Sequence, residues 1–272
     1  MSDTIDWRGS VGKEWADKVD GLDLLLGPTG DAGIEALGDL SGKCVLDVGC
    51  GAGTTSRALA ARGAIVTGAD ISSDLLDVAR ERGHANYIMA DASADPLGGP
   101  HDAVYSRCGA MFFDDPVAAW SHIRSEVSKN ADLSIVCWCA AKENGWASIP
   151  MHAARDILEL HNVKQAPVGT PGPFGWADPA YFAPVLEQAG WRDLSWEAVE
   201  RPAMFTTGDN PDPVERAVEF TLRVGILARH LKGKSPELRA KVANSLRGVF
   251  HKYVEDDAVY VPTKAWVITG KG

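Results

Sequence analysis

The sequence predicts a three-layer α/β sandwich around a mostly parallel sheet. Short apolar runs alternate with helical patterns from residue 43 to residue 139, and such alternation indicates a parallel sheet with right-handed crossovers. A glycine-rich turn directly follows the first run. The run at 133–139, LSIVCWC, is apolar almost throughout, as expected of a central strand that is buried on both faces.

Residues 1–40 are expected to form an N-terminal helical cap. Between 12 and 26, apolar residues recur every three or four positions, as they do on one face of a helix: Trp15, Val19, Leu22 and Leu26. The sequence Gly27-Pro28-Thr29-Gly30 is expected to end this helix, because Gly and Pro both disfavour helix interiors. A second short helix is expected at 31–38.

The remaining residues, 41–272, are expected to form the sheet domain. Seven strands are expected, at 43–48, 64–69, 86–90, 102–106, 133–139, 194–199 and 258–269. Helices are expected around 53–62, from Ser72 or Ser73, from Pro116 to 129, and at 178–189. The last strand contains Pro262, which lacks a backbone donor, so this strand is expected at an edge of the sheet.

Two segments, 141–177 and 205–255, fall outside the alternation and are expected to cap the carboxyl edge of the sheet together with the N-terminal cap. They carry helical patterns near 148–161, 212–232 and 236–252, and a Pro/Gly-rich stretch at 165–175. Loops of that length are usually functional or disordered.

Composition excludes several classes of function. The chain has 27 Lys and Arg against 37 Asp and Glu, a formal net charge of −10, so most of its surface repels nucleic acid. No apolar run approaches the ~20 residues that cross a bilayer, and the polar N-terminus lacks the basic stretch and apolar core typical of a signal peptide. We therefore expect a cytoplasmic protein without a membrane partner. The five Cys have no Cys-x-x-Cys pair and the seven His lack metal-ligand spacing, so no metal is expected. The oligomeric state is left open.

The most informative segment is CVLDVGCGAGTT at 44–55. Gly49, Gly51 and Gly53 allow the backbone to turn tightly and approach a ligand closely, and the following helix adds N–H donors. A dinucleotide loop would read Gly-x-Gly-x-x-Gly. The sixth positions here are Thr54 and Ser56, which disfavours a nicotinamide-dependent oxidoreductase.

Three acids stand at the ends of expected parallel strands, at the edge where α/β sheets bind ligands. Asp47 precedes the glycine loop, where a carboxylate suits an ammonium group better than a phosphate. Asp70 lies at about the distance from the loop at which a carboxylate meets a ribose diol. Asp91 could accept a hydrogen bond from an adenine amino group. Together these groups match S-adenosylmethionine.

The motifs VLDVGCGAG, GADIS and MADAS, within roughly 43–140, resemble the successive motifs of class I S-adenosylmethionine-dependent methyltransferases. The resemblance implies a Rossmann-like fold with an antiparallel strand near its end. It implies that the glycine loop holds the methionine part of the cofactor, that the Asp70 segment binds the ribose, and that the Asp91 segment lies by the adenine. The implied cofactor residues are Asp47, Gly49, Cys50, Gly51, Gly53, Asp70, Ile71, Asp91 and Ala92.

A further resemblance, to a bacterial subgroup of small-molecule methyltransferases, rests on YSRCGAMFFDDPVAAW, CWCAAKENGWASIPM and PGPFGWADPAYFAPVLEQAGW and on Trp7 with Gly12-x-x-Trp15. It implies that Arg107 lines the cofactor, although a structural salt bridge is an equal alternative. Trp15 is expected either to close over the cofactor or to pack its helix against the rest of the protein.

The substrate is expected to contact Met111, Phe112 and Trp146. Phe113 could also line the pocket, but at least one of Met111, Phe112 and Phe113 is expected in the core, Phe113 first among them. Transfer of a methyl group from an activated sulfonium gains mainly from proximity and orientation. A base is needed only if the acceptor must lose a proton, and His152 is the candidate. The expected function is methyl transfer to a small-molecule acceptor by in-line displacement. The alternatives are a non-catalytic S-adenosylmethionine-binding module and, less favoured, a nicotinamide-dependent oxidoreductase.

Overall fold

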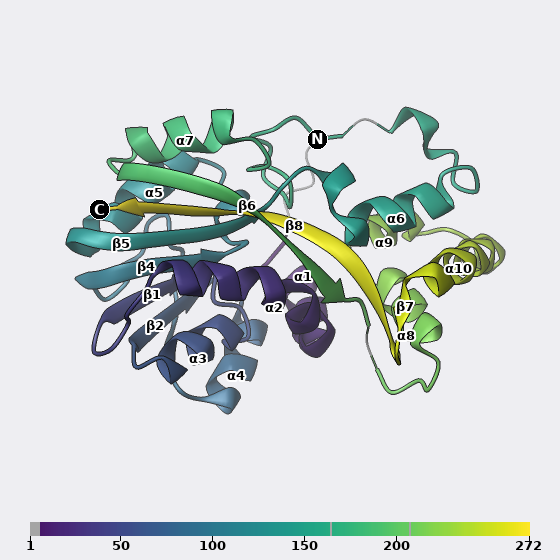
Figure 1. The fold of residues 1–272 in the computed structure, drawn as a ribbon, viewed down its shortest axis with the longest axis horizontal. Helices are drawn as coiled ribbons and strands as arrows, with labels where there is room; N and C mark the ends of the chain where they lie inside the picture. The colour runs from purple at the N-terminus through teal and green to yellow at the C-terminus, as the bar shows by residue number, and fades with distance from the viewer. Residues whose placement is uncertain (1–5, 164, 207) are drawn as a thin grey trace.

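A computed structural model describes residues 6–163, 165–206 and 208–272 and shows a twisted sheet with helices on both faces (Figure 1). Across the sheet, seven strands follow one another in the order β3-β2-β1-β4-β5-β8-β6. β8 is antiparallel to both neighbours, and the other described pairs along this path are parallel. The mostly parallel sheet with an antiparallel strand near the end is therefore confirmed. The strands are β1 (Cys44–Val48), β2 (Ile65–Asp70), β3 (Asn86–Met89), β4 (His101–Arg107), β5 (Val127–Trp138), β6 (Arg192–Met204), β7 (Val254–Glu255) and β8 (Ala258–Lys271).

Helices complete the two outer layers. α2 (Val19–Ala36), α3 (Thr54–Ala61) and α4 (Ser73–Arg82) cover one face, and α5 (Pro116–Ser125) and α7 (Pro179–Gln188) cover the other (Figure 1). The side chain of Ser72 accepts a hydrogen bond from the Leu75 N–H at 3.4 Å, so the expected cap of α4 is present. α5 and α7 each begin with Pro after a capping Asp, where the missing N–H of proline is harmless.

The expectation that Gly27–Gly30 ends the first helix is wrong, because α2 runs through Pro28 to Ala36. The actual break falls at Asp17 and Lys18, after α1 (Ser10–Ala16). The buried Gly30 lets α2 lie close to the sheet, since a Cβ at this position would come within 2.7 Å of Arg107 Cδ. The hydroxyl of Tyr105 donates to the Gly30 carbonyl at 2.9 Å. Packing against the sheet therefore outweighs the local helix-breaking tendency.

The expected edge position of the last strand is also wrong. From Ala265 to Lys271, β8 pairs with β5 on one side and with β6 on the other. Pro262 lies beyond the paired part of β5, opposite Pro202 of β6. Because β8 and β6 continue there as a two-stranded ribbon, the missing donor of Pro262 interrupts no ladder to a third strand.

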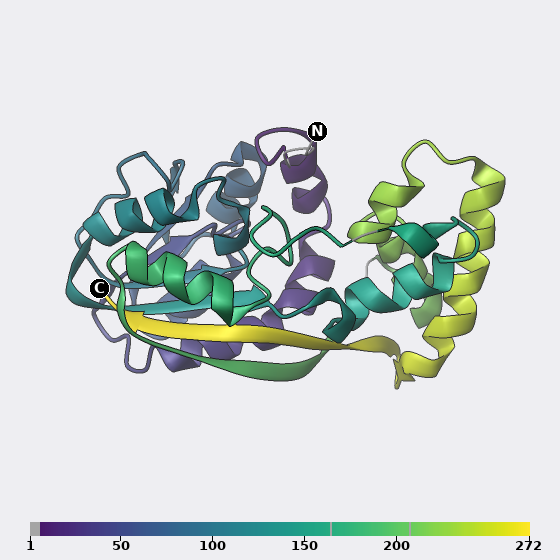
Figure 2. The same cartoon turned by 90° about the horizontal axis from the view of Figure 1, so that it is seen from above.

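At the far end of this ribbon lies a helical lobe made of α6 (Gly145–Ala154), α8 (Pro213–Thr221), α9 (Ile226–Leu231) and α10 (Pro236–Phe250) (Figure 2). The helix expected at 148–161 starts earlier and ends at Ala154. The one expected at 212–232 divides before Gly225, whose φ of +92° is left-handed. Short 3-10 turns are η1 (Ala110–Phe112), η2 (Ala141–Glu143), η3 (Leu160–Asn162) and η4 (His251–Tyr253).

The expected N-terminal cap divides into two parts. α2 packs against β4, β5, β6 and β8 as part of a helical layer, whereas α1 packs against α4. In the described ranges, no helix is both long enough and apolar enough to cross a membrane. The five cysteines are free thiols, four of them buried.

Candidate cofactor site

The glycine loop connects β1 to α3 at the carboxyl edge of the sheet. Gly49, Gly51 and Gly53 have φ angles of +70°, +53° and +78°, in the left-handed region that favours glycine. The loop is anchored where the Gly49 and Cys50 N–H groups donate to the Ala69 carbonyl at 2.9 and 3.1 Å. A Cβ on Gly53 would collide with the ring of Tyr87, but a Cβ on Gly51 would meet no protein atom within 4 Å. Gly51 therefore borders open space.

Asp70 ends β2 beside this loop. Its carboxylate accepts the Gly51 N–H at 2.8 Å and the Ser72 N–H at 2.9 Å, one on each oxygen. Burial raises the pKa of Asp70, while these hydrogen bonds oppose the rise. A carboxylate offers about four acceptor positions. Two are used here, which leaves one on each oxygen for an adjacent pair of hydroxyls.

Asp47 lies beneath the loop and is fully buried. One of its oxygens accepts hydrogen bonds from the hydroxyls of Thr55 and Ser56, both at 2.6 Å. Its other oxygen, Oδ1, is buried, and the described residues provide no donor for it. Burial raises the pKa of Asp47. A buried carboxylate oxygen without a partner is costly, so this position suits a donor supplied by a ligand.

Asp91 follows β3 at the same edge. One of its oxygens accepts hydrogen bonds from the Ser93 N–H at 3.0 Å and the Ser93 hydroxyl at 2.5 Å. The other lies 3.4 Å from an Arg8 nitrogen. These hydrogen bonds from Ser93 lower the pKa of Asp91, and Arg8 adds to the effect. Ala92 is buried and Ile71 is half-buried. The lowered pKa means that Asp91 is ionised at neutral pH. Its carboxylate also contacts the N-terminal segment through Arg8.

Arg107, at the end of β4, has a side chain only 10% exposed. Its single described ion pair is a long one, 3.5 Å to Asp23 of α2. Asp23 is more firmly held elsewhere, by the Thr54 hydroxyl at 2.6 Å and by Arg82 at 3.1 Å. The Arg107 guanidinium has five donors and makes no hydrogen bond with described residues, so it can bind an anion. The sequence left two roles open for Arg107, a contact with the cofactor or a structural salt bridge. The salt bridge to Asp23 exists, but it leaves most of the guanidinium donors unused by the described residues.

The N-terminal segment reaches this edge from above. Trp7 makes edge-to-face contacts with Trp15 and Phe112, with ring centroids 5.0 and 5.1 Å apart. Gly12 of α1 approaches Ser72 so closely that a Cβ would collide with its hydroxyl. Trp15 therefore packs in an aromatic cluster that joins α1 to η1, next to the acids of β2 and β3.

The expected substrate residues lie in different surroundings. Met111 is buried in the core, and its carbonyl accepts a hydrogen bond from the Gly172 N–H at 2.9 Å. Trp146 of α6 stacks on Phe174 with a centroid distance of 5.4 Å and lies 5.5 Å from Trp138. The indole N–H of Trp146 is buried and has no acceptor among the described residues.

His152 lies on the exposed side of α6 and forms no ion pair with a described acid. The structure therefore brings the acids expected to bind the cofactor to the carboxyl edge of the sheet, whereas His152 lies on α6 of the helical lobe.

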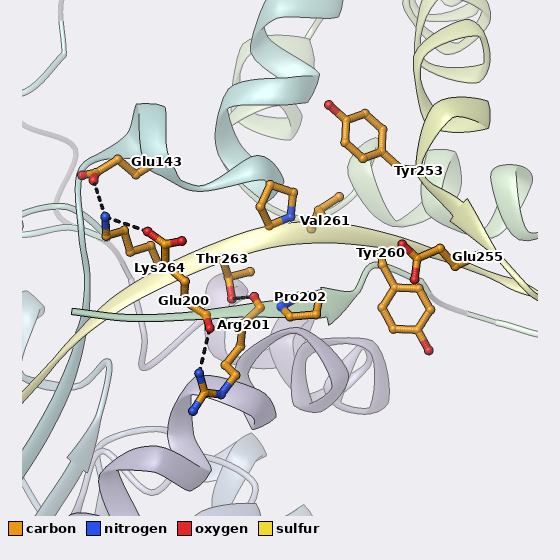
Figure 3. Close-up of a pocket in the computed structure, with 11 residues that line it drawn as sticks. Glu143, Glu200, Arg201, Pro202, Tyr253, Glu255, Tyr260, Val261, Thr263 and Lys264 are labelled. Atoms are coloured by element: carbon orange, nitrogen blue, oxygen red, sulfur yellow. Dashed lines mark hydrogen bonds and ion pairs between the residues drawn. The ribbon is translucent and has the colours of Figure 1, made fainter. Parts of the chain in front are cut away.

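A pocket of about 610 Å³ lies elsewhere, along the β6–β8 ribbon (Figure 3). Lys264 bridges Glu143 at 3.1 Å and Glu200 at 2.8 Å there. None of the cofactor residues expected from the sequence lines this pocket. The described ion pairs of Lys264 in this pocket are with Glu143 and Glu200 and not with residues of the glycine loop. The candidate site is therefore the carboxyl edge of the sheet.

This strand order, with a glycine loop after β1 and acids after β2 and β3, is Rossmann-like and is similar to that of class I S-adenosylmethionine-dependent methyltransferases. A family model described as "Methyltransferase domain" matches residues 45–129. The cofactor of this class is S-adenosylmethionine. The orphaned Asp47 oxygen, the open space beside Gly51 and the barely paired Arg107 guanidinium are compatible with that ligand.

Two curated relatives illustrate the similarity. A ubiquinone biosynthesis O-methyltransferase of Bordetella bronchiseptica is 35% identical over 112 residues, which are 41% of this chain and 44% of the relative. A magnesium-protoporphyrin O-methyltransferase of Rhodobacter capsulatus is 34% identical over 110 residues, 38% of this chain and 48% of the relative. The matched part thus spans less than half of each relative.

Solved structures share the fold over most of the chain. The YcgJ protein of Bacillus subtilis has a TM-score of 0.54 at 15% identity and covers 90% of this chain and 98% of that one. Haemonchus contortus phosphoethanolamine N-methyltransferase 2, in complex with S-adenosyl-L-methionine, has a TM-score of 0.50 at 18% identity and covers 96% of this chain and 56% of that one.

Sequence reasoning missed several residues of this edge. Asp23 joins Thr54, Arg82 and Arg107, and Arg8 pairs with Asp91 across 83 positions. Both are ordinary charged residues in the sequence, without a motif around them. Only the folded arrangement of α1 and α2 over the sheet brings them to the site.

Proposed function

We propose that the protein transfers the methyl group of S-adenosylmethionine to a small-molecule acceptor. The observation that carries the proposal is the Asp70 carboxylate, which is tied to Gly51 and Ser72 and keeps one acceptor position free on each oxygen. Those two positions suit the ribose diol, Asp91 suits the adenine amino group, and Asp47 Oδ1 suits the methionine ammonium. Arg107 suits the methionine carboxylate, because its guanidinium is nearly buried and barely paired.

When bound, S-adenosylmethionine supplies an activated methyl group, which an acceptor lone pair attacks in line as the carbon–sulfur bond breaks and its electrons return to sulfur. The contribution of this chain is to orient both reactants and exclude water. Trp146 and Phe174 offer the acceptor an aromatic surface, and Phe112 packs on Trp7 of the N-terminal segment beside the cofactor edge. His152 is the proposed proton acceptor for an acceptor group that must lose a proton; its exposed position on α6 requires that the acceptor reach toward it.

The direct experiment is a transfer assay with methyl-labelled S-adenosylmethionine and a panel of small-molecule acceptors, with parallel binding measurements for S-adenosylhomocysteine and NAD. Label transfer and S-adenosylhomocysteine binding support the proposal. Tight binding without transfer to any acceptor favours the binding module, and binding of NAD alone favours the oxidoreductase. His152→Ala tests the base: an unchanged kcat over the pH range would remove His152 from the mechanism.

A further inference from the structure

The helical lobe carries a strongly positive segment in an otherwise acidic chain. From residue 222 to residue 252 there are eight Lys and Arg and one acid, Glu237, although the formal net charge of the chain is −10. Two of these basic residues have a structural role. Arg247 pairs with Glu215, and Arg239 donates to carbonyl groups at the ends of α8 and α9.

Four other basic residues gather at the end of α9 and in the loop to α10; this basic cluster consists of Arg229, His230, Lys232 and Lys234. Arg229, Lys232 and Lys234 are exposed, and none of the ion pairs among described residues includes them. Burial lowers the pKa of His230, and the charges of Arg229 and Lys234 lower it further. Arg229 and Lys234 therefore lie close to His230, and Glu237 is the one acid in the sequence between residues 222 and 252.

A path of contacts leads from the end of β4 to Gly225, at the start of the helix whose far end carries the basic cluster. Met111, just after β4, holds Gly172 through its carbonyl. Two residues further on, Phe174 stacks on Trp146 of α6. Gly225, the N-cap of α9, faces the same indole, because a Cβ on Gly225 would lie 4.0 Å from it.

We propose that the basic cluster binds an anionic group, a carboxylate or a phosphate, on the methyl acceptor, while the acceptor's body rests on Trp146 and Phe174. This inference rests on the proposed function and names its substrate class. Exposed cations without an ion-pair partner attract an anion and orient it. A nucleic acid fits less well, because the cluster spans only six positions without an aromatic residue, and the rest of the acidic chain would repel a long phosphate backbone.

Three aromatic probes of similar size test the charge preference: benzoate, phenyl phosphate and benzyl alcohol. Their binding to the protein saturated with S-adenosylhomocysteine is followed by ligand-observed NMR titration. We expect the better of the two anions to bind about five- to tenfold more tightly than the neutral alcohol, the scale of two exposed charge contacts. Whichever anion binds more tightly identifies carboxylate or phosphate as the preferred group.

The variant Lys232→Ala/Lys234→Ala should abolish this preference. Its matched control, Lys129→Ala/Lys142→Ala, also removes two exposed lysines that form no ion pair with described residues. Both lie outside residues 222–252, so this variant should keep the preference. Equal binding of the three probes, or a preference that survives in the cluster variant, would overturn the inference. The inference would also be overturned if a 20-nucleotide single strand bound to the wild type and not to the cluster variant, while the three probes showed no preference for an anion. S-adenosylhomocysteine binding, measured on the same samples, separates this failure from failure of the proposed function itself.

Discussion

The Asp70 carboxylate accepts a hydrogen bond from the Gly51 N–H at 2.8 Å, so the acid after β2 also fixes the loop after β1. This contact couples two motifs that lie 19 positions apart. It holds Gly51 in its left-handed conformation and turns the carboxylate toward the open space beside the loop. Asp70 thus positions the loop as well as offering acceptors to a diol.

Asp70→Asn should weaken S-adenosylhomocysteine binding by about one to two decades, because a charged acceptor is lost, at a cost of ~1.5–3 kcal/mol. Binding of 5′-methylthioadenosine, which retains the ribose, should weaken equally. Calorimetry gives both values. The control is Asp102→Asn, which also removes a carboxylate that accepts a backbone N–H, that of Cys44 at 3.0 Å, but at the opposite end of the sheet. Unchanged affinity in a folded Asp70 variant would exclude the ribose contact.

Gly51→Ala should reduce S-adenosylhomocysteine affinity at least about tenfold, because the new methyl group enters the open space beside the loop. Gly38→Ala is a matched control, since Gly38 also has a positive φ, +68°, and no atom within 4 Å of an added Cβ. Both variants should lose a similar stability of about 1–2 kcal/mol from backbone strain, measured by thermal unfolding. Equal affinities in the two variants would mean that Gly51 does not border the cofactor.

Arg107→Met should weaken S-adenosylhomocysteine binding by about one to two decades and leave 5′-methylthioadenosine binding within about twofold of wild type. The reason is that the smaller ligand lacks the methionine carboxylate that Arg107 is proposed to bind. Methionine keeps most of the apolar volume beside Gly30. If both ligands lost affinity to the same extent, Arg107 would act through the structure of the site and not through the carboxylate.

We expect the N-terminal segment and the 165–175 stretch to close over the bound cofactor. Arg8 and Trp7 connect this segment to Asp91 and Phe112, so ligand binding should tighten it. Hydrogen exchange should show stronger protection of amides in 8–26 and 165–176 when S-adenosylhomocysteine is present, with α10 amides unchanged as an internal reference. Equal protection of these amides with and without ligand would mean that the two segments do not close over the cofactor.

The sequence predicted the sheet and its carboxyl-edge acids because both depend on local patterns. β1 to β4 lie within a residue or two of their expected positions, and Asp47, Asp70 and Asp91 meet at one edge because parallel strands end there. The course of α2 through Pro28 was not predictable from its own sequence, since contacts with β4 and β5 decide it.

The interior position of β8 was not predictable either. Pro262 indicated an edge strand, but it lies in the part of β8 beyond β5, whereas residues 265–271 of the same strand pair with both β5 and β6. At the site, Asp23 and Arg8 escaped notice because their partners are 31 to 84 positions away in the sequence. Residues whose roles depend on such long-range contacts carry no local signal.

The most direct test of the account is a crystal structure of the protein with S-adenosylhomocysteine. We predict that the ligand lies along the carboxyl edge, with both ribose hydroxyls within hydrogen-bond distance of the Asp70 carboxylate and the methionine carboxylate on Arg107. A ligand bound instead in the pocket along the β6–β8 ribbon, or a carboxyl edge that stays empty at saturating ligand, would contradict it.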